Sequence, residues 1–324
     1  MSVSAGGTGR SAGSIVVNAR PYGDALAGGL GSLLGESETV VVCDGASRVP
    51  RDAEVLVTLL GDPDAIRALL VPSIRWAHVL GAGVDGFPFD ALGERPLTCS
   101  RGAAASAIAE WVLGVMLAFE KSLPESWIRA VPDRWNTASL GTLAERTVGL
   151  VGIGAIGSEV ARRCVAFDAQ VVAVRRSTAV PALPGIEMMG DLGELLARSD
   201  HVVIAAPATP QTYHLMDAAA FSVVKPGVHL VNVARGSLLD QEALRPALDD
   251  GRVARASLDT VDPEPLPEGH WLYTHPSVRL SPHISWSAPG TMPNTLALFV
   301  DNVRRFRAGG APALCGLVDP DARY

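Results

Sequence analysis

The sequence has few of the residues that cross-link small secreted proteins or bind nucleic acid. Its 324 residues include only four cysteines, which lie far apart and form no Cys-x-x-Cys pair: Cys43, Cys99, Cys164 and Cys315. This spacing argues against a disulfide framework or a zinc or other metal site and favours the reducing cytoplasm. The net charge of −7 provides no basic footprint for nucleic acid. A small anionic ligand would need local positive charge.

Long apolar runs are also missing. The most apolar stretch, residues 103–119, carries Glu110 in its middle and is short for a membrane span. Residues 1–13 are rich in glycine and serine without an apolar segment, so they predict a flexible tail rather than a secretory signal. We expect no membrane partner.

The length predicts two domains, and short apolar runs alternate with helical segments in both halves. This alternation predicts an α/β fold with parallel sheets and right-handed crossovers. Residues 103–119 are expected to form a long buried helix that links the halves. The expected strands are 14–19, 39–43, 55–59, 76–80, 147–151, 170–174, 201–205, 229–232, 254–258 and 278–280. The other expected helices are 63–70, 156–167, 192–197, 241–249 (with Asp240 as its N-cap) and 291–307.

A glycine-rich turn, VGLVGIGAIG at 148–157, follows one of these strands and precedes a helix. Gly152 permits a tight turn, Gly154 lets the backbone approach a pyrophosphate, and Gly157 lets helix and strand pack closely. The helix start, with Ala155 and Ile156, presents free N–H groups to the phosphates. The pattern alone also occurs in structural turns, and the strand–turn–helix context favours dinucleotide binding.

The end of the next strand bears on the choice of cofactor. An NAD site has a carboxylate there for the ribose hydroxyls, whereas this chain has Arg175, Arg176 and Ser177. Two guanidinium groups suit the 2′-phosphate of NADP(H), which we therefore favour, with NAD(H) possible. The alternative is a solvated basic turn.

Three later segments contain residues suited to acid–base chemistry on an anionic substrate, each just after an expected strand. Arg235 lies in NVARG, Asp259, Asp262 and Glu264 lie in LDTVDPEPL, and His283 lies in SPHI. Histidine exchanges protons near neutral pH, and a neighbouring carboxylate favours its protonated form. Each residue type also serves structural purposes, and spacing alone does not bring them together.

In this order the four motifs resemble the D-isomer-specific 2-hydroxyacid dehydrogenase family, which includes glyoxylate/hydroxypyruvate reductases and phosphoglycerate dehydrogenase. The resemblance extends from about Val79 to the final helix. It implies two Rossmann-like domains, with a cofactor domain (103–287) inserted into a discontinuous substrate domain (14–102 and 288–324) and the cofactor between them. It also implies a homodimer, formed in part by the long helix after Gly102.

The resemblance further implies roles for single residues. Arg235 would bind the substrate carboxylate and carbonyl oxygen, and His283, paired with Glu264, would be the general acid/base. The remaining implied contacts are Ala82, Gly83 and Val84 for the substrate carboxylate, and Ala206, Pro207, Thr209, Val233, Ala234 and Asp259 for the cofactor.

One departure concerns the substrate. Small residues often follow the histidine in this family, whereas this chain has Ser285, Trp286 and Ser287, and Trp286 would narrow or cap the pocket. We expect an NADPH-dependent interconversion of a small 2-oxo acid and a D-2-hydroxy acid. The alternatives are a dehydrogenase of a phosphonate or other oxyanion analogue, and a non-catalytic dinucleotide-sensing corepressor.

Overall fold

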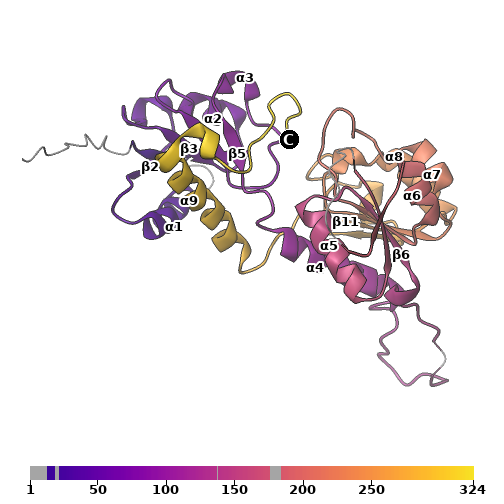
Figure 1. The fold of residues 1–324 in the computed structure, drawn as a ribbon. Helices are drawn as coiled ribbons and strands as arrows, with labels where there is room; N and C mark the ends of the chain where they lie inside the picture. The colour runs from indigo at the N-terminus through magenta and orange to yellow at the C-terminus, as the bar shows by residue number, and fades with distance from the viewer. Residues whose placement is uncertain (1–12, 19–21, 137, 176–183) are drawn as a thin grey trace, which may run out of the picture. The chain divides into compact units, whose positions relative to one another are not determined.

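The computed structural model describes residues 13–18, 22–136, 138–175 and 184–324 (Figure 1). The chain divides into two compact units. Unit 1 comprises Met1–Ala103 and Met292–Tyr324, and unit 2 comprises Ala104–Thr291. Within the described part of the chain, every helix is too short or too polar to span a lipid bilayer. Of the expected tail, only Gly13 belongs to the described residues.

Unit 1 contains a parallel five-stranded sheet in the order β2-β1-β3-β4-β5. Helices α1 and α9 cover one face, where Leu30 and Phe299 pack on the sheet, and α2 and α3 cover the other (Figure 1). The elements are β1 (Ile15–Asn18), α1 (Gly23–Leu34), β2 (Val40–Cys43), β3 (Val55–Thr58), α2 (Pro63–Leu69), β4 (Trp76–Val79), α3 (Phe89–Leu92), β5 (Leu97–Cys99) and α9 (Thr291–Gly309).

Unit 2 contains a parallel seven-stranded sheet in the order β12-β11-β10-β9-β6-β7-β8. Helices α4 and α5 cover one face, and α6, α7 and α8 cover the other (Figure 1). The strands are β6 (Thr147–Val151), β7 (Gln170–Val174), β8 (Ile186–Met188), β9 (His201–Ile204), β10 (Val228–Asn232), β11 (Val253–Leu258) and β12 (Val278–Leu280). The helices are α4 (Ala105–Glu120), α5 (Ala155–Ala166), α6 (Leu192–Arg198), α7 (Ala218–Val223) and α8 (Gln241–Asp249).

These elements confirm the predicted α/β class with parallel sheets. The Asp240 carboxylate caps α8 by accepting from the N–H groups of Glu242 and Ala243, as its position predicted. Five elements of the structure were not predicted: α1, α3, α7, β5 and β8. In α1 the glycine-rich segment has low intrinsic helix propensity, and burial of Leu26 and Leu30 on the sheet stabilises it.

Candidate active site

The glycine-rich turn lies between β6 and α5. Gly152 has a φ of 100°, a conformation that favours glycine. A Cβ atom on Gly152 would lie 2.8 Å from the backbone of Ala206, and one on Gly157 would overlap the carbonyl oxygen of Gly152. The first and third glycines are therefore required for close packing of the turn, the helix and the neighbouring strand.

Open space lies beside the second glycine at the start of α5. Among the described residues, no atom beyond Gly154 and its chain neighbours lies within 4 Å of the position that a Cβ atom on Gly154 would take. Gly154 is the N-cap of α5 and, having no side chain, provides no cap for the first N–H groups of the helix, those of Ala155, Ile156 and Gly157. Uncapped N–H groups and the positive end of the helix dipole favour a phosphate here. These residues fit the pyrophosphate of a dinucleotide.

The next strand, β7, ends where a dinucleotide-binding site contacts the adenosine ribose. Arg175 follows β7 directly, and its side chain is exposed. Arg176 and Ser177, which complete the predicted basic turn, lie outside the described residues. A guanidinium group thus follows the strand where an NAD-type site has a carboxylate.

The turn after β9 lies against the glycine turn, as the close approach of Ala206 to Gly152 shows. The N–H of Thr209 donates to Thr212 Oγ1 at 2.8 Å, and the Thr212 hydroxyl donates to Pro207 O at 2.7 Å. In the sheet order, β6 and β9 are neighbours from which the chain proceeds in opposite directions. Open α/β sheets bind ligands at such a switch point.

Arg235 follows β10 at the same edge of the sheet. Asn232, which is fully buried, accepts from the N–H of Ala234 at 3.0 Å and donates its amide to Arg235 O at 2.9 Å. The half-buried Arg235 side chain donates to Ala234 O at 2.7 Å. These bonds fix the turn that contains the buried Val233 and Ala234. The Arg235 side chain therefore extends from a well-ordered turn.

The loop after β11 packs on this turn and carries Glu264. A Cβ atom on Gly236 would overlap the backbone of Val261. The N–H of Val261 donates to Glu264 Oε1 at 3.1 Å, and Glu264 Oε2 lies 2.8 Å from His283 Nδ1. Because an ionised carboxylate only accepts hydrogen bonds, His283 Nδ1 carries a hydrogen and Nε2 is available for proton exchange. Both side chains are 38% exposed, so a small molecule can reach the ring.

Asp259 fixes the loop that carries His283. This carboxylate, in a residue only 1% exposed, accepts from the N–H groups of Ile284 and Ser285 at 2.9 Å and from the hydroxyl of Ser281. Its backbone oxygen accepts from the N–H of His283 at 2.9 Å. The predicted nicotinamide-side carboxylate is thus bonded to the 281–285 loop.

In unit 1 the predicted substrate loop follows β4 at the carboxyl edge of the sheet. Gly81 N–H donates to Val79 O at 2.9 Å, which turns the chain away from the strand. Ala82 is exposed, Gly83 is half-buried and Val84 is buried. Within the described residues, the three N–H groups of this segment donate to no backbone carbonyl. They are suited to binding an anionic group.

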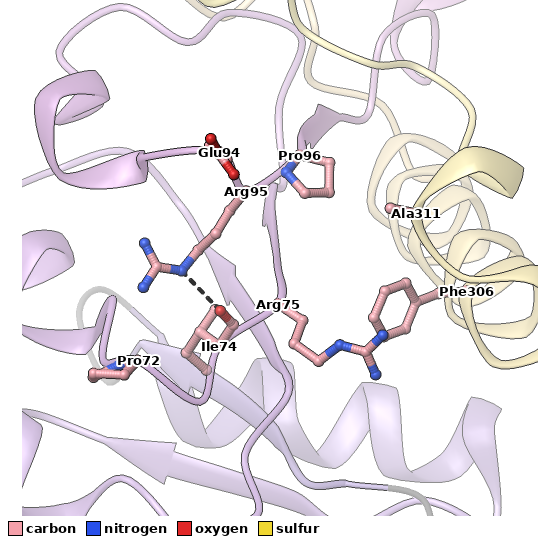
Figure 2. A pocket seen from close by; sticks show the side chains of 8 residues that line it. All are labelled: Pro72, Ile74, Arg75, Glu94, Arg95, Pro96, Phe306 and Ala311. Carbon is pink, nitrogen blue, oxygen red and sulfur yellow. Dashed lines mark hydrogen bonds between the residues drawn. The ribbon is translucent and has the colours of Figure 1, made fainter.

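A depression of about 490 Å³ lies at the opposite edge of this sheet, before β4 and β5 (Figure 2). Arg95 donates to Ile74 O at 2.8 Å. Arg75 pairs with Glu54 at 3.0 Å and lies over the Phe306 ring, 5.3 Å from its centroid. The two guanidinium groups point apart in Figure 2 and are bonded within unit 1, so we assign no ligand to this depression.

Three contributors to the site were not predicted: Asn232, Ser281 and Thr212. Asn232 and Ser281 are polar residues at the ends of strands, which is a weak signal, whereas Thr212 lies eight residues after β9 and has no such signal. Asn232 and Thr212 donate to backbone carbonyls of their own loops, and Ser281 donates to the Asp259 carboxylate, a bond that depends on β11 and β12 being neighbours in the sheet.

Comparisons with known proteins identify the family. The profile described as "D-isomer specific 2-hydroxyacid dehydrogenase, NAD binding domain" matches residues 113–285, which lie within unit 2. The glyoxylate reductase of Thermofilum pendens is 34% identical over 251 residues, which are 72% of this chain and 73% of that protein. The D-3-phosphoglycerate dehydrogenase of Mycobacterium tuberculosis is 33% identical over 298 residues. This match covers 88% of this chain and 56% of that enzyme, so the chain spans little more than half its length.

Among solved structures, a D-isomer specific 2-hydroxyacid dehydrogenase from Xanthobacter autotrophicus Py2, in complex with NADPH and MES, aligns with a TM-score of 0.82. It is 27% identical, and the alignment covers 97% of this chain and 100% of that one. The chain therefore belongs to the D-isomer specific 2-hydroxyacid dehydrogenase family, and the predicted resemblance is confirmed. It is an oxidoreductase that uses a nicotinamide dinucleotide and acts on CH–OH groups.

Proposed function

We propose that the chain reduces a small 2-oxo acid such as glyoxylate or hydroxypyruvate to a D-2-hydroxy acid with NADPH, or catalyses the reverse reaction. The observation that carries this proposal is the 2.8 Å pair between His283 Nδ1 and Glu264 Oε2, at the same sheet edge as Arg235. The likeness to named glyoxylate reductases supports the substrate class. In this proposal unit 2 is the cofactor domain and unit 1 the substrate domain.

The residues divide the chemistry between them. When bound, the reduced nicotinamide supplies a hydride to the carbonyl carbon. The planar Arg235 guanidinium binds the substrate carboxylate and the carbonyl oxygen, and the N–H groups of Ala82, Gly83 and Val84 bind the carboxylate. The protonated His283 ring delivers the proton from Nε2 to that oxygen. Glu264, bonded to Nδ1, favours the protonated ring.

The preference for NADPH rests on Arg175 at the end of β7 and on Arg176 in the sequence. Replacing both with glutamine should weaken NADPH binding by about 2–3 kcal/mol, the worth of two charge-assisted hydrogen bonds, and NADH binding much less. Arg162→Gln, an exposed α5 arginine paired with Glu159, is the control. Equal losses for both cofactors would contradict the assignment.

A homodimer and a cytoplasmic location complete the proposal. The segment after α4 exposes four large apolar side chains: Trp127 at 67%, Ile128 at 58%, Val131 at 97% and Trp135 at 71%. Such a concentration is typical of a protein–protein interface, and a second copy of the chain is our proposed partner. All four cysteines are free thiols, which favours a reducing compartment.

Steady-state kinetics on a panel of 2-oxo acids, with NADPH and with NADH, test the activity. His283→Ala should lower the rate about 10²–10⁴-fold while NADPH still binds. Arg235→Lys, which loses the planar fork, should lower kcat/KM about a hundredfold. The controls are His275→Ala and Arg252→Lys, whose side chains pair with Asp249 and Asp250 away from this edge. Near-normal turnover in His283→Ala would refute the proposed chemistry.

The pH dependence tests the pairing separately. Reduction requires a protonated His283 ring, so its rate should fall as the pH rises, and oxidation should show the opposite trend. Glu264→Gln keeps the shape but removes the charge that favours the protonated ring. The falling limb for reduction should therefore move to lower pH. An unmoved profile would show that Glu264 is not the functional partner, and Asp259 and Asp262 would be tested next.

A further inference from the structure

The backbone at His283 has an unusual conformation. Its φ is 53°, in the left-handed region that a residue with a Cβ atom rarely adopts. Such a conformation persists only where the surrounding structure holds it. The residue that the proposed function uses as its acid/base therefore depends on its neighbours for the direction of its ring.

The N–H groups of this turn are held by Asp259. The His283 N–H donates to the backbone oxygen of Asp259, and the next two N–H groups donate to its carboxylate, all at 2.9 Å. Asp259 offers nothing to the carbonyl oxygen of His283, because its side chain and its backbone oxygen only accept. That carbonyl needs a donor from elsewhere.

Trp286 supplies the donor. Its indole Nε1–H donates to His283 O at 2.8 Å. Trp286 is itself anchored, because its own carbonyl accepts from the hydroxyl of Thr291, the first residue of α9, at 2.7 Å. The ring is 43% exposed, so burial of apolar surface explains only part of its position.

We propose that Trp286 is a positioning residue for His283: its indole N–H holds the left-handed turn that directs the imidazole toward Glu264. This inference rests on the proposed function and adds to it a residue that acts through His283 rather than on the substrate. It also gives the ring a task different from that of the pocket wall that its size predicts.

Two variants separate the donor from the ring. Trp286→Phe keeps an aromatic ring without a donor, and Trp286→Gln keeps an N–H donor without the ring. Trp271→Phe is the matched control, because the buried Trp271 Nε1 meets no acceptor among the described residues. With glyoxylate as the probe, Trp286→Phe should lower kcat about fivefold and leave KM within twofold, since an ordinary hydrogen bond shifts an equilibrium by about that factor. Trp286→Gln should recover most of kcat.

Two further readouts distinguish positioning from a general structural effect. The falling limb of the pH–rate profile should move to lower pH in Trp286→Phe, as it should in Glu264→Gln. The double variant should lose less kcat, on a free-energy scale, than the two single variants together. NMR titration of the histidine rings, with the His283 signal assigned by its absence in His283→Ala, should show the His283 titration moving to lower pH in Trp286→Phe without any substrate.

A rise in KM at unchanged kcat in both Trp286 variants would overturn the inference and make the ring a pocket wall. Equal kcat in Trp286→Phe and Trp271→Phe would also overturn it. The NMR titration keeps the inference distinct from the proposed function. If no 2-oxo acid is reduced, the function fails, while an altered His283 titration in Trp286→Phe still supports the positioning role.

Discussion

A buried ion pair at the end of α4 provides a stability test of unit 2. The Glu120 side chain is 1% exposed, and it accepts two hydrogen bonds from Arg146, at 2.9 and 3.0 Å, and one from His201 Nε2 at 3.0 Å. Burial alone would raise the pKa of Glu120, but the hydrogen bonds from His201 and Arg146 hold that pKa below its usual value. The carboxylate is therefore ionised and connects α4 to the starts of β6 and β9.

Glu120→Ala should destabilise unit 2 strongly. Removing one partner of a buried ion pair costs about 3–5 kcal/mol, and the lower end applies because Arg146 is 34% exposed and regains water. For a unit of this size, about 3 kcal/mol corresponds to a decrease of about 6–12 °C in the Tm of its transition. Differential scanning calorimetry measures this decrease in Tm. The transition that belongs to unit 2 is the one whose Tm increases when NADPH is added.

Arg162→Ala is the matched control within unit 2, because the exposed Arg162 side chain pairs with Glu159 on the surface of α5. An exposed pair of this kind contributes about 0.5 kcal/mol or less. Glu120→Gln keeps the shape of the side chain and one acceptor oxygen, so the Tm of its unit 2 transition should lie between those of Glu120→Ala and the control. If the unit 2 transition of Glu120→Ala lies within about 2 °C of that of the Arg162→Ala control, the ion pair does not contribute as reasoned.

Three further predictions concern other parts of the chain. Gly157→Ala, whose Cβ would overlap the Gly152 carbonyl, should abolish NADPH binding measured by fluorescence. Burial lowers the pKa of His78 to about 3, so the unfolded chain takes up a proton below about pH 6.5 and the folded chain does not. The free energy of unfolding should therefore fall by about 2 kcal/mol between pH 6.5 and 5. In His78→Gln, urea unfolding should show a decrease over the same range that is smaller by about this amount. Replacing Trp127 and Val131 with serine should convert a dimer to a monomer in light scattering.

The sequence predicted the parallel α/β class because buried strands of β-branched residues alternate with helical segments. The ends of β6, β7, β12 and α8 agree with prediction because the flanking residues, such as Asp240 before α8, mark them. Helix α1 escaped prediction because its stability comes from packing rather than from propensity. Strand β5 was missed although β12, which also has three residues, was predicted, so a run this short is an undependable signal.

The residue types of the candidate site were predictable from the sequence, but the hydrogen bonds that position these residues were not. Arg235, Glu264 and His283 follow successive strands, which places them at one sheet edge. Which carboxylate meets the ring is a matter of loop conformation: Glu264 binds His283, while Asp259 binds the backbone of the next residues. The indole bond of Trp286 has no signal in the sequence, because it depends on a left-handed turn at a residue that is not glycine.

The discontinuity of unit 1 has a consequence for how the chain is synthesised. Trp76 is fully buried and stacks on Phe299 of α9, with ring centroids 5.4 Å apart, so one face of the unit 1 sheet needs a helix that is translated more than two hundred residues later. Unit 2 is contiguous, and it emerges complete before α9 does. On the ribosome the second unit is therefore complete before the face around Trp76 receives the α9 side chains that cover it together with α1.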